Sequence, residues 1–331
     1  MEHETHNHHS ENAKKDYTIP ASIVIAAIII VGAMMYKEGL KTGSGKQSAN
    51  ITEGFEAARS VLEEAVLPSS GVVLPVRWGS LGAKLVDAGA IDAQKFKALY
   101  TQQGALPKEY ETLLSGNSAD NLTITSDNAG YILNLFWAFG LANKNSILDS
   151  GEMVNPQYGG AQNFASTGGW TIAKGDAMEH YSKHPFVVLT AEQQALVDKM
   201  ARLIYRPCCN NSTHFPDCNH GMAMLGFLEL MASQGVSEAD MYKAALAVNS
   251  YWFPDNYLTI AAYMQSKGIE WNKVDAKEIL GANYSSASGY QAIASRVVAP
   301  ASSQGGSGCG VSAGQPAPTS AVRRQPSCGV N

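Results

Sequence analysis

The stretch RPCCNNSTHFPDCNHGM, residues 206–222, lies between two segments with helical periodicity and gathers soft donor side chains. It holds three of the five cysteines and two of the eight histidines: Cys208, Cys209, Cys218, His214 and His220. Thiolate and imidazole are ligands that zinc and copper accept in proteins. The sequence therefore predicts a functional site here, positioned by the helices on either side.

The flanking helices have recognisable start signals. Thr190 and Gln193 form the pattern of a capping box, in which a hydroxyl and an amide side chain satisfy free backbone N–H groups. Asp217 is expected to cap a second helix over about 218–233. Cys218 then lies at a helix N-terminus, where the helix dipole favours a thiolate.

The first interpretation of this stretch is a binding site for a transition metal, zinc or copper, or for haem. One of the adjacent residues Cys208 and Cys209 is expected to act as a ligand with Cys218 and His220, because neighbouring cysteines rarely both bind one tetrahedral ion. His214 is a further candidate metal ligand. No Cys-x-x-Cys-His motif indicates covalent haem.

Two more histidines belong to the same part of the sequence. His180 and His184 are four residues apart and share one face if their segment is helical. We therefore treat them, with His214, as candidate cofactor ligands, including ligands of a b-type haem.

The second interpretation is a thiol-dependent redox or transfer enzyme centred on Cys218. His220 or His214 is the candidate base, and Asp217 would orient it. Cys309, in the C-terminal tail, would act as a resolving or delivering thiol. The third interpretation is a structural or interaction domain with one disulfide, between Cys218 and one of the two adjacent cysteines.

The pattern over 51–299 predicts one compact all-α domain of roughly ten helices, without a strand pair. The apolar run at 72–76 is interrupted by Pro75, so any strand there would be short or at a sheet edge. The segment from Asp127 to Asn143 is the strongest core helix, and Ser126 is expected to cap it.

The remaining segments predict a membrane-anchored protein. Residues 1–18 form a polar, histidine-rich tail, and 19–36 form a charge-free apolar span that nearly crosses a bilayer. Residues 37–50 are a linker. Residues 300–331, with Cys309 and Cys328, lack the composition for a packed core and are expected to be disordered.

Charge and composition indicate which partners to expect. The net charge is −5 and only 16% of the residues are charged, so nothing predicts a nucleic-acid surface. The membrane is the one partner that the sequence indicates. Lysines lie on both sides of the apolar span and do not settle its orientation, so the composition alone favours a domain outside the cytoplasm.

Overall fold

The computed structural model describes residues 57–101 and 105–297. From Arg59 on, they belong to one compact unit. Within the described ranges, no helix has the length and apolar character needed to cross a bilayer. The predicted anchor at 19–36 and the tail at 300–331 lie outside these ranges, so both stay predictions.

The prediction of an all-α domain needs one correction, because the mostly helical fold also contains a two-stranded antiparallel sheet. Strand β1, Val72–Gly79, pairs with β2, Ser118–Ile124. The register shifts between Val73 and Arg77, around Pro75, which has no N–H to donate to the ladder. The sequence did not indicate β2, because only Leu122 and Ile124 are buried in a polar segment.

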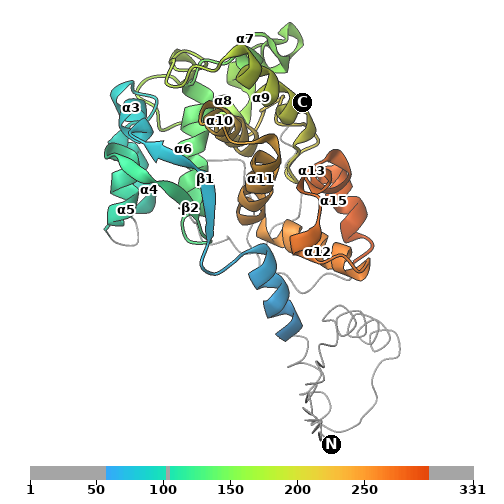
Figure 1. Ribbon diagram of the computed structural model, residues 1–331. Coiled ribbons are helices and arrows are strands. Elements are labelled where there is room, and N and C mark those ends of the chain that lie inside the picture. The colour runs from blue at the N-terminus through green and yellow to red at the C-terminus, as the bar shows by residue number, and fades with distance from the viewer. Residues whose placement is uncertain (1–56, 102–104, 298–331) are drawn as a thin grey trace, which may run out of the picture. The chain divides into compact units, whose positions relative to one another are not determined.

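Three short helices lie between the two strands along the chain, and both long and short helices follow the second strand (Figure 1). A first helix covers 57–66. The other α-helices are α3 Leu81–Asp87, α4 Ala93–Tyr100, α5 Lys108–Ser115, α6 Ala129–Ala142, α7 Ser146–Ser150, α8 Ala165–Gly168, α9 Ala191–Leu203, α10 Asn219–Ser233, α11 Glu238–Trp252, α12 Pro254–Ser266, α13 Ala276–Ile279, α14 Ala282–Ser285 and α15 Ala287–Ala294.

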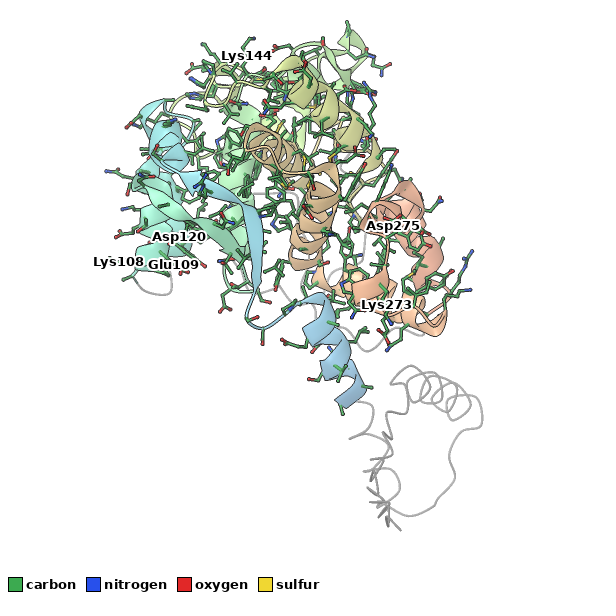
Figure 2. All side chains as sticks on the ribbon, in the orientation of Figure 1. Lys108, Glu109, Asp120, Lys144, Lys273 and Asp275 are labelled. Atoms are coloured by element: carbon green, nitrogen blue, oxygen red, sulfur yellow. The ribbon has the colours of Figure 1, made fainter. Side chains whose placement is uncertain are left out.

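Single 3₁₀ turns connect these helices in the long central segment and after α12. They are η1 Glu152–Val154, η2 Pro156–Tyr158, η3 Ala161–Asn163, η4 Ala177–Glu179 and η5 Trp271–Lys273. The charged side chains labelled in Figure 2 are all exposed, from Lys108 on α5 to Asp275 before α13. The apolar side chains of α6, α10 and α11 lie in the interior.

Helices α6 and α10 cross with their backbones in direct contact. A β-carbon at Gly140 would overlap the carbonyl oxygen of Met222, and one at Gly226 would lie 2.7 Å from the carbonyl oxygen of Phe136. Glycine is therefore required on both sides of the crossing. This contact holds α10, and with it the cysteine at its start, against the centre of the domain.

Gly140→Ala should lower the free energy of unfolding by roughly 2–3 kcal/mol, because the new methyl group must push the two backbones apart. The matched control is Gly130→Ala in the same helix, where an added β-carbon meets nothing within 4 Å. That variant should be neutral or more stable by up to about 1 kcal/mol. Urea denaturation measures both, and equal effects would contradict the packing argument.

Candidate metal-binding site

The segment between α9 and α10 is fixed by hydrogen bonds from several elements. The capping box at Thr190 and Gln193 is present, so the predicted start of α9 is confirmed. Thr213 N–H donates to the carbonyl oxygen of Ile204, closing the loop upon itself. From α15, Ala287 N–H donates to the carbonyl oxygen of Cys209. The cysteines are thus presented by a loop that is tied at both ends.

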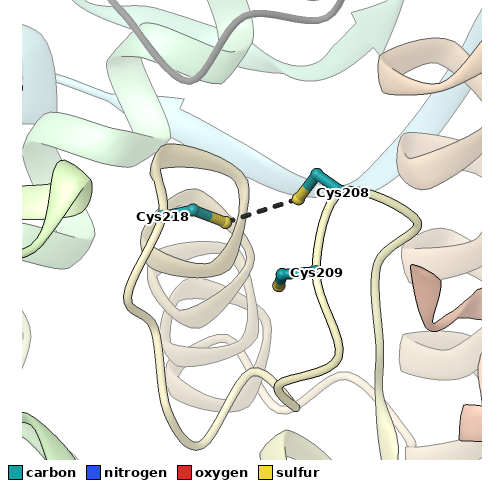
Figure 3. A group of neighbouring side chains, drawn as sticks. All are labelled: Cys208, Cys209 and Cys218. Atoms are coloured by element: carbon teal, nitrogen blue, oxygen red, sulfur yellow. Dashed lines mark hydrogen bonds between the residues drawn. The ribbon is translucent and has the colours of Figure 1, made fainter. Parts of the chain in front are cut away.

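The structure brings three sulfur atoms together, two from the loop and one from the start of α10 (Figure 3). All three Sγ atoms lie within 4.8 Å of one another, and those of Cys208 and Cys218 are 3.5 Å apart. Two thiolates bound to one tetrahedral ion at the usual 2.3 Å have sulfurs about 3.8 Å apart. The arrangement can hold a metal ion, and both adjacent cysteines lie in it, whereas the sequence led us to expect only one of them as a ligand.

The same distances exclude a disulfide in this structure. A disulfide requires its sulfur atoms about 2.05 Å apart, whereas Cys208 and Cys218 are 3.5 Å apart. All three cysteines in the described ranges are free thiols. The interpretation with one internal disulfide is therefore not what the structure shows.

Arg206 contacts the cysteine cluster through Cys218, and its side chain is only 1% exposed. Its Nε donates to the Cys218 sulfur at 3.0 Å, and Nη2 donates to Asp217 in a buried ion pair. Its remaining donors bond the carbonyl oxygens of Asn211 and Phe215 at 2.9 and 3.0 Å. The guanidinium therefore fixes the loop and provides the positive charge closest to the thiols.

Asp217 does not cap α10 as predicted. The N-cap residue is Cys218, which makes no side-chain cap bond, and the amide oxygen of Asn219 accepts from the N–H of His220 at 2.9 Å. The two oxygens of Asp217 accept from Arg206 and from the amide of Asn211 instead. The Asp217 carboxylate pairs with Arg206 and not with the helix start, because the charge of the buried guanidinium would otherwise be uncompensated.

Gly221 makes room for the guanidinium. A β-carbon there would lie 2.5 Å from Arg206 Cζ, so the first turn of α10 approaches Arg206 at a distance that only glycine allows. The role of Arg206 could not be predicted from the sequence, since a single buried arginine produces no periodic pattern. The one feature of the sequence that could have indicated a close neighbour here is Gly221, a glycine in the first turn of the predicted helix.

The pKa values of the thiols in the cluster are shifted in opposite directions. Burial raises the pKa of Cys218, but hydrogen bonds from Cys208 and Cys209 and the charge of Arg206 outweigh it, so this pKa lies well below its ordinary value. Hydrogen bonds to Cys209 and Cys218, together with burial, raise the pKa of Cys208 well above its ordinary value. Burial also raises the pKa of Asp217 to about 6.

Of the two histidines in the stretch, only His220 influences the thiols, but no nitrogen of its ring lies within 4.8 Å of all three sulfurs. It is 5% exposed, its ring packs on Phe253 with centroids 4.3 Å apart, and its proximity contributes to lowering the pKa of Cys218. His214 is held elsewhere, with Nδ1 and Nε2 each 2.8 Å from a carboxylate oxygen of Glu152 and Asp198. Both of its ring nitrogens are engaged, so we leave His214 out of the candidate ligand set.

His180 and His184 contact each other and not the cysteines. Their segment is a turn, with Ser182 at φ +50°, and His180 Nδ1 lies 3.1 Å from His184 Nε2. His180 Nε2 bonds the carbonyl oxygen of Lys174 at 2.9 Å. The direct bond between the rings leaves no space for a haem iron between them.

A surface cavity of about 1040 Å³ beside α13–α15 is lined by neither histidine nor cysteine.

A second buried acid lies farther along α10. Glu229 is fully buried, and its two oxygens accept from the amides of Asn143 and Asn145 at 2.6 and 2.7 Å. Burial raises the pKa of Glu229 to about 8, against its ordinary 4.5. Sequence reasoning missed this residue, because a single acid in an apolar helix gives no indication of its partners.

The raised pKa of Glu229 predicts a pH dependence of stability. Between pH 4.5 and 8 the folded chain keeps a proton that the unfolded chain has lost, so stability falls as the pH rises through this window. The slope is roughly 1.4 kcal/mol per pH unit. Asp217, with a pKa of about 6, adds a slope of the same sign only below pH 6.

Glu229→Gln should therefore remove most of the loss of stability between pH 6 and 8. Denaturant titrations of both proteins at pH 6, 7 and 8 measure it. Parallel curves for the two proteins would contradict a carboxyl group that stays protonated in the folded chain.

Comparison with known proteins gives no relative for this chain. No protein family, no curated protein and no solved structure matches it.

Proposed function

We propose that the protein binds one thiophilic transition-metal ion, zinc or copper, between Cys208, Cys209 and Cys218. The observation that supports this is the convergence of three free sulfurs within 4.8 Å of one another. An all-sulfur donor set favours soft or borderline ions over magnesium or calcium. Arg206 would donate its N–H group to a bound thiolate, as groups around a metal's own ligands commonly do.

The alternative, a thiol-dependent redox or transfer enzyme, also has support. Arg206 Nε donates to Cys218 Sγ, which stabilises a thiolate at that position. However, Cys218 is 0% exposed, so a substrate can approach only the partly buried Cys208 and Cys209. The metal-binding proposal needs no such access for a bulky substrate, and we prefer it.

Metal analysis combined with thiol counting separates the two functions. The full chain is purified without a histidine tag, and reactive thiols are counted before and after chelation. Metal binding predicts one ion per chain and three thiols that react only after the chelator is added. Freely reactive thiols without metal would contradict the proposal and favour the enzyme. A variant with Cys309→Ser and Cys328→Ser should give the same three protected thiols.

We also propose that residues 19–36 anchor this domain in a membrane, on its extracytoplasmic side. The support is the charge-free apolar span with tyrosines near both ends. The protein should stay in the membrane pellet after carbonate extraction, with its N-terminus uncleaved. Release into the soluble fraction, or a mature start beyond Lys37, would contradict the anchor.

A further inference from the structure

His220 has a buried polar atom without a partner. Its Nδ1 is among the few buried side-chain nitrogens and oxygens in the described ranges that form no hydrogen bond. Buried polar atoms are bonded in the great majority of cases, and an exception indicates a missing partner such as an ion or a water molecule. Every polar group of Arg206 and Asp217, by contrast, has protein partners beside it.

The imidazole of His220 is held by packing in the helix turn that begins at Cys218. His220 lies in the first turn of α10, two residues after Cys218. Its ring packs between Phe253, with centroids 4.3 Å apart, and the edge of Trp252, at 6.1 Å. Imidazole nitrogens are common metal ligands in proteins.

We propose that the His220 side chain turns toward the three sulfurs and binds the ion through Nδ1 as its fourth ligand, which makes the site a tetrahedral Cys₃His centre for a divalent ion of the zinc class. This inference rests on the proposed function, since it assumes that the three cysteines bind a metal. A Cys₃His set is one of the usual closed sets for structural zinc, which takes four ligands in tetrahedral geometry.

The charges of the cluster favour a divalent ion over Cu(I). Three thiolates and the Asp217 carboxylate carry a charge of −4, of which a divalent ion and the Arg206 guanidinium compensate +3. A monovalent ion would leave one more uncompensated negative charge around Cys218, which is 0% exposed. Uncompensated charge in such a place is strongly unfavourable.

X-ray absorption of the zinc-loaded full chain tests the ligand set. The inference predicts three sulfur atoms at about 2.3 Å and one nitrogen at about 2.0–2.1 Å from zinc. The nitrogen should be absent in His220→Ala, and zinc affinity should be weaker by more than about 100-fold, because a ligand is lost and not merely a group that supports one. The matched control is His214→Gln, since His214 is also 5% exposed, and it should keep the nitrogen and the affinity.

A second variant distinguishes the loss of a ligand from misfolding of the protein. His220→Cys should restore tight binding with four sulfurs, visible as stronger sulfur-to-cobalt charge-transfer bands in the Co²⁺-loaded protein. Three sulfurs in the wild type with oxygen or nothing in the fourth position, unchanged in His220→Ala, would overturn the inference and leave the proposed function standing. Absence of zinc or cobalt binding altogether would instead mean that the proposed function has failed.

Discussion

Cys218→Ser should weaken zinc binding by more than about 100-fold while leaving the fold intact. A hydroxyl is nearly isosteric with a thiol but is a poor ligand for a soft ion. Losing a group that merely supports a ligand costs about 10–100-fold in affinity, so losing a ligand should cost more. Competition with a chromophoric chelator measures the affinity, and circular dichroism confirms the fold.

The controls for this prediction are Cys309→Ser and Cys328→Ser, which lie outside the described ranges and should bind zinc like the wild type. Wild-type affinity in Cys218→Ser would remove the best-placed donor from the site. Equal losses in all three variants would indicate a site that includes the C-terminal tail.

Arg206→Lys should lower the free energy of unfolding by about 3–5 kcal/mol, the usual cost of breaking a buried ion pair. Lysine keeps the charge but cannot reach Cys218, Asp217 and two carbonyl oxygens at once, because it lacks the planar fork of donors. The buried acceptors would then lose their partners. Denaturant titration of the metal-free protein isolates this effect from metal binding.

Arg202→Lys provides the matched control. Arg202 also forms a two-bond pair with an aspartate, Asp198, but its side chain is 54% exposed. Exposed pairs contribute about 0–1 kcal/mol, so this change should be close to neutral. If Arg206→Lys is as mild as Arg202→Lys, Arg206 does not organise the cluster.

The sequence predicted the helices on either side of the site because their signals are local. The capping box at Thr190 begins α9 within the chain segment that shows it, and the apolar residues after Cys218 define α10. Strand β2 was missed because its pairing with β1 is a long-range contact and its own residues are mostly polar.

The candidate site was predicted in composition but not in arrangement. Clustering along the chain identified the three cysteines, since a short loop keeps them close in space. It could not distinguish His220 from His214, because the carboxylates that engage His214 come from Glu152 and Asp198, far away in the sequence. Nor could it find Arg206, whose partners depend on how the loop folds back.

The most direct test of the account is a zinc titration of the full chain against the variant in which Cys208, Cys209 and Cys218 are all serine. In both proteins His3, His6, His8 and His9 are replaced by asparagine, so that the N-terminal tail does not contribute. The account predicts one zinc ion per chain with a dissociation constant below about 100 nM, and no such binding in the triple variant. Equal binding by both proteins, or none by either, would contradict a metal site at the three cysteines.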